Sequence, residues 1–145
     1  MLTMYLMQGK VALITRGDFG IGRAMCYYFA QEGPAIAFTY VKGGEEEGDE
    51  DTLQKIKELK MDEAKDPIAA AIAADTGYDE NCKTVVDQTV ESYGWINKLV
   101  NNAAKSRLGG IEEMTEDGLV RMFKTNIFSY FFVTRQASDY NKFIN

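Results

Sequence analysis

Histidine is absent from the 145 residues of this sequence. This absence excludes a Ser-His-Asp triad, a Cys-His protease and a His-ligated zinc centre, since each of these needs an imidazole. Cysteine is almost as scarce, because only Cys26 and Cys82 occur, far apart and without a CxxC motif. We therefore expect two reduced core thiols in a cytoplasmic protein.

Long apolar runs and basic stretches are also missing. No stretch is long and apolar enough to cross a membrane, and Met1–Lys10 lacks the basic start and the long apolar run of a secretory signal. The formal net charge of −6 argues against a nucleic-acid-binding surface, which needs a basic stripe. Much of the acid lies in Glu45–Asp51, which we interpret as a solvated loop and helix start. We expect neither a membrane nor nucleic acid as a partner.

What the sequence does contain is an alternation of two patterns. Continuous apolar runs predict buried strands at Lys10–Thr15, Ala35–Tyr40 and Lys98–Asn102. The alanine-rich run Pro67–Asp75 also fits a helix, but Pro67 at its start and Asp75–Gly77 at its end favour a third strand. Helical spacing predicts helices at Ile21–Glu32, about Asp51–Met61, from an N-cap at Asp79 to Gly94, and about Asp117–Ser138. Lys142–Asn145 is interpreted as the start of a fifth strand. The alternation predicts an α/β fold, a Rossmann-like doubly wound parallel sheet in a single domain, residues 1–145, truncated after four to five strands.

The first predicted strand runs into a turn that contains Gly17, Gly20 and Gly22, and a helix follows at once. A glycine turn between a strand and a helix is the layout of a dinucleotide-binding site, because free N–H groups at the helix N-terminus receive phosphates. Glycines also occur in turns that bind nothing, so this motif alone leaves both interpretations open.

Three further motifs follow in order. Asp75 ends the third strand, Asn101–Ala104 (Asn-Asn-Ala-Ala) ends the fourth, and Asn126 lies in the last long helix. Together with Thr15 and Gly20–Gly22, they make the sequence resemble the short-chain dehydrogenase/reductase family, from Gly9 to Asn145. The amino-acid sequences of several segments are similar to those of the family branch called glucose and ribitol dehydrogenase homologues.

The resemblance implies an NAD(P)-dependent oxidoreductase that acts on an alcohol, polyol or sugar and is a homo-oligomer when complete. The cofactor-binding residues that it implies are Thr15, Gly17, Asp18, Gly20, Ile21, Gly22, Tyr40, Lys42, Asp75, Thr76, Asn102, Ala103 and Ala104. It places Gly20 and Gly22 against the pyrophosphate and Asp75 on the adenine amino group. Asn102 and Ala103 line the cofactor ribose, and Asn102 also ties the sheet together. The structural alternatives are a strand-end cap for Asp75 and a turn for the two asparagines.

The end of the second strand bears on which cofactor binds. NAD-dependent members often carry an acid there, which holds the ribose 2′-OH and repels a 2′-phosphate. This sequence has the neutral Tyr40, followed by Lys42, which favours NADP over NAD. The missing acid also disfavours a methyltransferase on a related fold.

The family's catalytic tetrad consists of Asn, Ser, Tyr and Lys, and only Asn126 is found here. Tyr140 has Ile144 where a Y-x-x-x-K pair needs lysine. We therefore expect no turnover by these 145 residues alone. The alternative function is an inactive fragment that binds nucleotide weakly or associates with full-length subunits. Asn126 is also open to a structural interpretation, as an amide bonded to nearby backbone.

Two further expectations follow from the missing half. The fourth strand becomes a sheet edge, and the helix of about Asp117–Ser138 leaves apolar surface exposed.

Arg16 stands where the family motif has a glycine, directly after Thr15. One interpretation is a lesion, because a non-glycine residue in a special backbone region costs about 1–3 kcal/mol. The other is a functional charge, because a guanidinium can pair with the 2′-phosphate of NADP. We favour the lesion, and the sequence leaves both open.

Overall fold

The computed structural model of the chain describes residues 7–44, 48–60, 69–106 and 109–140. Its strands are β1 (Val11–Ile14), β2 (Ala35–Tyr40), β3 (Ala69–Ala73) and β4 (Lys98–Val100). Its helices are α1 (Gly20–Glu32), α2 (Asp49–Leu59), α3 (Asp79–Tyr93), the 3₁₀ turn η1 (Ile111–Glu113), α4 (Glu116–Phe123), the π turn η2 (Lys124–Phe128) and α5 (Ser129–Ser138). The strands form one parallel sheet in the order β3-β2-β1-β4. This confirms the predicted Rossmann-like α/β fold.

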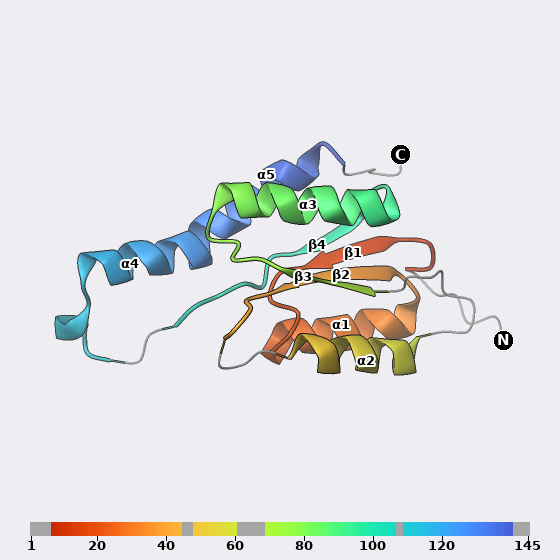
Figure 1. Ribbon diagram of the computed structural model, residues 1–145, viewed down its shortest axis with the longest axis horizontal. Coiled ribbons are helices and arrows are strands. Elements are labelled where there is room, and N and C mark those ends of the chain that lie inside the picture. The colour runs from red at the N-terminus through yellow and green to blue at the C-terminus, as the bar shows by residue number, and fades with distance from the viewer. Residues whose placement is uncertain (1–6, 45–47, 61–68, 107–108, 141–145) are drawn as a thin grey trace.

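Helices cover both faces of the sheet (Figure 1), with α1 and α2 on one face and α3 and α5 on the other. β1 lies inside the sheet, where Leu13 pairs with Ala37 of β2 and with Leu99 of β4. Every residue of β1 is buried, as expected for a strand covered on both faces. β4 lies at an edge of the described sheet, as predicted.

Successive side chains of each strand point to opposite faces and so supply two separate cores. Leu13 packs with Val85, Val86 and Val133 beneath α3 and α5. Its neighbour Ile14 packs in the second core, beneath α1 and α2, whose buried members are Ala12, Ile14, Cys26, Ala30, Ile36, Phe38 and Ile56. The two free cysteines are both buried, one in each core.

Several predicted boundaries shift by a few residues. β4 ends at Val100 rather than at Asn102, because the Asn102 N–H donates to the Thr15 hydroxyl instead of to a neighbouring strand. The prediction of Asp79 as an N-cap is wrong, since Tyr78 holds that position and Asp79 is the first residue of α3. Asp79 instead accepts hydrogen bonds from Arg135 and Gln136 of α5. Pro67 and Lys142–Asn145 lie outside the described residues.

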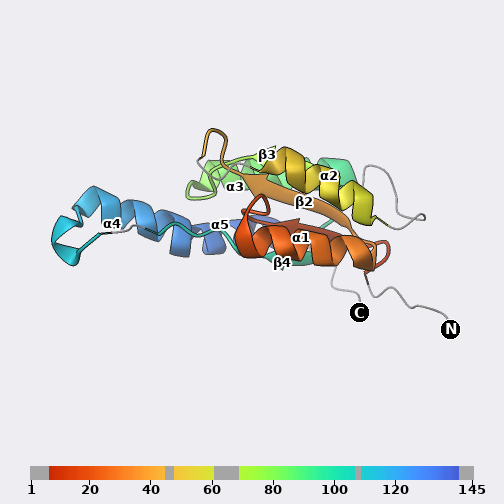
Figure 2. The same ribbon diagram turned by 90° about the horizontal axis from the view of Figure 1, so that it is seen from below.

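The sequence pattern predicts one uninterrupted helix at the end of the chain. The structure instead divides this helix by the π turn η2. Here the Ser129 N–H donates to the carbonyl of Lys124, five residues earlier. The Ser129 hydroxyl donates to the Thr125 carbonyl. The turn joins α4 to α5, and α4 extends beyond the sheet (Figure 2).

This helix packs on the core with its smaller side chains. The buried face carries Thr125, Ser129, Val133 and Ala137. The exposed side carries a stripe of large apolar residues, each four positions from the next: Leu119, Phe123, Ile127 and Phe131. The predicted exposed apolar surface is therefore confirmed. None of the helices in the described ranges is long and apolar enough to cross a membrane.

Candidate functional site

The predicted site residues gather at the carboxyl edge of the sheet. The turn after β1 and the first turn of α1 hold Thr15 to Gly22. Tyr40, Asp75 and Asn102 lie at or just after the ends of β2, β3 and β4. β2 and β3 lie on one side of β1, and β4 lies on the other, so the order in which the parallel strands are added reverses between β1 and β4. The crevice outside such a switch point is where open α/β sheets bind ligands.

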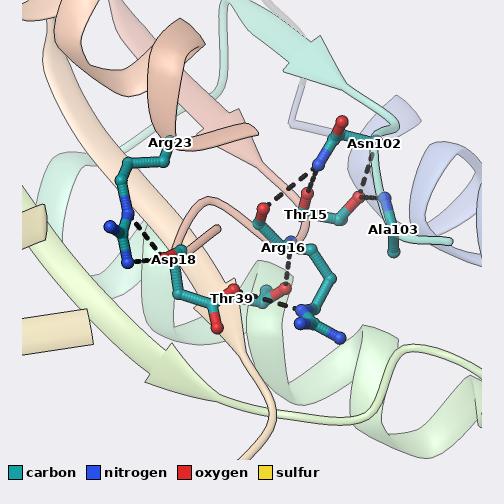
Figure 3. Close-up of polar contacts among 7 residues, drawn as sticks. All are labelled: Thr15, Arg16, Asp18, Arg23, Thr39, Asn102 and Ala103. Atoms are coloured by element: carbon teal, nitrogen blue, oxygen red, sulfur yellow. Dashed lines mark hydrogen bonds and ion pairs between the residues drawn. The ribbon is translucent and has the colours of Figure 1, made fainter. Parts of the chain in front are cut away.

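The buried hydroxyl of Thr15 ties β1 to the turn after β4 (Figure 3). It accepts the N–H groups of Asn102 and Ala103, both at 2.9 Å, and lies 3.4 Å from the carbonyl of Val100, to which it donates. These contacts use the hydroxyl completely inside the protein. Thr15 therefore supports the site by holding the backbone around it, and its hydroxyl is not available to a ligand.

Asn102 holds the same turn from the other side. Its Nδ2 donates to the carbonyl oxygens of Thr15 and Arg16, both at 3.1 Å (Figure 3). The expectation that Asn102 ties the sheet together is met by these two bonds. Ala103 is buried, and Ala104 is exposed beside it.

The glycines of the turn serve different purposes. A Cβ on Gly22 would lie 2.1 Å from the Arg16 carbonyl oxygen, and one on Gly17 would lie 2.5 Å from Cβ of Phe38. These two glycines allow close packing of the turn against the protein itself. Gly20 has open space around it but a φ of +54°, which L side chains rarely adopt. It sets the path of the chain into α1.

The N-terminus of α1 is open for an anion. No side chain caps it at Phe19, and its first turn contains no acidic residue. The N–H groups at the start of a helix carry partial positive charge and lack partners within the helix. Ile21, in this first turn, is 76% exposed. These features fit the pyrophosphate of a dinucleotide.

Arg16 stands where the family motif has glycine and adopts a left-handed backbone conformation, with a φ of 53°. Its N–H donates to the Thr39 hydroxyl at 3.0 Å, and its Nε pairs with Oδ1 of Asp18 at 3.1 Å (Figure 3). The Asp18 carboxylate is buried, and its Oδ2 has no hydrogen-bond partner among the described residues. The Arg16 side chain thus lies against an acid of its own turn.

Arg23 is a residue of this region that sequence reasoning missed. Its Nε donates to the carbonyl oxygen of Asp18 at 2.7 Å, and a second guanidinium nitrogen donates to the same atom (Figure 3). The bond joins the first turn of α1 back to the glycine turn. A lone arginine on a helix gives no sequence signal for such a contact.

Burial also determines the state of the thiol beneath this turn. The pKa of Cys26 is raised from 9.0 to about 12 by loss of solvent and by the negative charge of Asp18. A thiol with so high a pKa is protonated at neutral pH and is a poor nucleophile. Cys26 is therefore a packing residue.

Asp75 lies just past β3 with both carboxylate oxygens bonded. Oδ1 accepts the Gly77 N–H at 3.0 Å, and Oδ2 pairs with the guanidinium of Arg121. The carbonyl of the next residue, Thr76, accepts the Cys82 thiol at 3.1 Å. Arg121 lies 46 positions away on α4 and was also missed from the sequence.

Asn126 lies within the π turn, where its amide makes two reciprocal bonds with one backbone unit. Its Oδ1 accepts the Lys105 N–H at 2.7 Å, and its Nδ2 donates to the Lys105 carbonyl at 2.8 Å. These two bonds agree with the interpretation of Asn126 as a structural amide bonded to nearby backbone. π turns occur frequently at functional sites, so a second role is compatible with the first.

Comparison with known proteins matches residues 10–142 to the family model described as short chain dehydrogenase. The chain belongs to the short-chain dehydrogenase family. It is 56% identical over 137 residues to NADPH-dependent aldehyde reductase 1, chloroplastic, of Arabidopsis thaliana, covering 94% of this chain and 47% of that protein. It is 54% identical over 132 residues to glucose and ribitol dehydrogenase of Daucus carota, covering 90% of this chain and 45% of the relative.

A solved structure shares the fold of this family member. The short-chain dehydrogenase from Burkholderia cenocepacia, in complex with NADP, superimposes with a TM-score of 0.81 at 29% identity. The match covers 93% of this chain and 52% of that one. The chain thus spans about half the length of the relatives it matches.

Proposed function

We propose that the carboxyl edge of the sheet binds a nicotinamide dinucleotide, as the cofactor-binding part of an NAD(P)-dependent oxidoreductase. The uncapped N-terminus of α1 carries the proposal, because it offers N–H groups to the pyrophosphate beside Gly20 to Gly22. Asp75 would accept the adenine amino group, next to Thr76, and Asn102 and Ala103 would line a ribose. Thr15 and Asn102 would hold this edge in shape through the bonds described above.

The proposed substrate is an alcohol, polyol, sugar or aldehyde. The two plant relatives support this class through their names, which specify glucose and ribitol for one and an aldehyde for the other. The bound cofactor would exchange hydride with the substrate carbon. Asn126 is the residue of this chain that the family assigns to proton transfer, and its bonds to Lys105 would fix its position.

NADP is the cofactor we favour. β2 ends at Tyr40, which has no charge to repel a 2′-phosphate, and Lys42 is exposed two residues further on. One relative is named as NADPH-dependent and one solved neighbour contains NADP. We also propose that the complete protein is a homo-oligomer, for which the exposed apolar stripe on α4, η2 and α5 is the available surface. A cytoplasmic location stays a prediction from the two buried thiols.

Lys42→Glu tests the cofactor preference. We expect this change to weaken NADP binding at least about fivefold and to leave NAD binding within about twofold, because it places a carboxylate near the 2′-phosphate. Lys98→Glu is the matched control, since it makes the same change at the start of β4, which is at the amino end of the parallel strands and away from the proposed site. Calorimetric titration of both cofactors at one salt concentration gives the comparison. Tighter binding of NAD than NADP by the unchanged chain would contradict the preference.

A further inference from the structure

The Asp75 carboxylate is held at both oxygens and still accessible. Oδ1 accepts the Gly77 N–H and Oδ2 pairs with Arg121. An ionised carboxylate offers about four acceptor positions, so two are left for a ligand. The side chain is 28% exposed, which leaves these positions within reach of solvent and ligand.

Arg121 is itself held firmly. Its Nη1 donates to the hydroxyl of Thr125 at 2.7 Å, and Thr125 is buried in the π turn. The centre of the guanidinium lies 5.5 Å from the ring centroid of Tyr78, at the start of α3. The guanidinium therefore lies between two fixed elements and carries little freedom of its own.

Gly77 provides the space for this contact. A Cβ at Gly77 would lie 2.6 Å from Nη1 of Arg121 and 3.1 Å from Oδ1 of Asp75. Without a side chain there, the turn after β3 admits the guanidinium and also presents its N–H to the carboxylate. Two groups thus meet at the Asp75 carboxylate: the Gly77 N–H of the same turn and the guanidinium of Arg121 from α4.

We infer that Arg121 is a positioning residue that fixes the Asp75 carboxylate to receive an exocyclic amino group, which makes the site selective for adenine over hypoxanthine. This inference rests on the proposed dinucleotide site. Removing the guanidinium would leave Asp75 held by one N–H, free to turn about its side-chain torsions. The planar donor fork of arginine restrains a carboxylate better than a point charge does.

The test compares NADP with deamino-NADP, in which a carbonyl oxygen replaces the adenine amino group. We expect the unchanged chain to bind NADP about tenfold more tightly, as for a hydrogen bond to a charged group. Arg121→Gln should reduce that ratio to about twofold or less. Arg135→Gln is the matched control, because it removes another arginine–carboxylate pair, with Asp79 at 2.5 Å, and leaves Asp75 untouched. This control should keep the full ratio.

The outcomes distinguish a failure of the role inferred for Arg121 from a failure of the proposed dinucleotide site. If Arg121→Gln keeps or increases the preference for NADP, the inference is overturned and the dinucleotide site stands. If the unchanged chain binds neither nucleotide, both fall. Circular dichroism checks the fold of the variant. Where Arg121→Gln loses helicity, Arg121→Lys replaces it: a ratio reduced at least about threefold supports the donor fork, and an unchanged ratio overturns it.

Discussion

Arg16 shows how one residue combines an unfavourable backbone with a favourable contact. Among the described residues it alone has a positive φ without being glycine. Such a conformation costs about 1–3 kcal/mol. Its side chain, however, supplies the cation beside the buried Asp18 carboxylate. The lesion interpretation accounts for the first fact only, and the two contributions oppose each other in any measurement of stability.

A double-mutant cycle separates them. In an Asp18→Asn chain, Arg16→Gly relieves the backbone strain of about 1–3 kcal/mol, and the greater freedom of glycine in the unfolded chain offsets part of that gain, so we expect the free energy of unfolding to rise by about 1 kcal/mol. With Asp18 present, the same change leaves a buried carboxylate without its cation. We expect it to be less favourable there by at least about 1 kcal/mol, because Arg16 is only 26% exposed. Equal effects in both backgrounds, measured by urea unfolding, would show that the ion pair contributes nothing.

Nucleotide titration of the same variants addresses the 2′-phosphate. If Arg16 is a lesion, adding Arg16→Gly to the Asp18→Asn chain should leave NADP binding at least as tight as before. If NADP affinity falls while NAD affinity holds, Arg16 is a phosphate ligand and the lesion interpretation is wrong.

At the scale of elements, the site depends on the junction between β1 and β4. β4 is three residues long and, within the described part of the chain, pairs only with β1, so its own ladder holds it weakly. The Thr15 hydroxyl adds three bonds to the segment Val100–Ala103, which is 85 to 88 positions away. This single oxygen thereby aligns the two strand ends that frame the proposed crevice.

Thr15→Val keeps the shape of the side chain and removes the oxygen. Two N–H groups would then lose their acceptor, and each unsatisfied buried group costs about 1–3 kcal/mol. We expect the free energy of unfolding to fall by roughly 2–4 kcal/mol. Thr15→Ser keeps the oxygen and loses one methyl group, so it should cost about 1 kcal/mol. Equal losses in the two variants, measured by urea unfolding, would mean that packing rather than hydrogen bonding holds this junction.

At the scale of the whole molecule, the sequence predicts the helices and strands that have a regular apolar pattern. It does not predict contacts between side chains that are far apart in the chain. Apolar runs are sufficient for β1 and β2, which are almost wholly buried, because a strand covered on both faces needs apolar residues throughout. The alanine-rich run of β3 also fits a helix, and only Pro67 and Asp75–Gly77 on either side of it favour a strand. The pairing of Asp75 with Arg121 leaves no such trace, and neither does the bonding of Asn126 to Lys105. Hydropathy also misses the π turn, since one extra residue in a helix changes the hydrogen bonding more than the pattern.

The buried ionisable groups predict how the whole molecule responds to alkali. Burial raises the pKa of both Cys26 and Cys82 from 9.0 to about 12, and that of Tyr93 from 10.0 to about 12. Above about pH 9 the unfolded chain releases protons that the folded chain keeps, so stability falls as pH rises towards 12. Each thiol contributes a slope of at most about 1.4 kcal/mol per pH unit.

Urea unfolding at about pH 8 and about pH 10 measures this slope. We expect the midpoint to be lower at the higher pH. Cys26→Ala should reduce the difference between the two midpoints, because it removes one of the titrating groups. A midpoint that does not change with pH would contradict the assignment of both thiols as neutral core residues.

The central claim, that the carboxyl edge of the sheet binds a nicotinamide dinucleotide, is tested most directly by amide NMR of the ¹⁵N-labelled chain titrated with NADP. We predict that the N–H signals of Gly20, Ile21, Gly22 and Gly77 shift in a saturable way. Those of Gly33 and Gly94, at the opposite edge, should stay in place. Spectra that are unchanged at millimolar NADP, or shifts that are largest at Gly33 and Gly94, would contradict the claim.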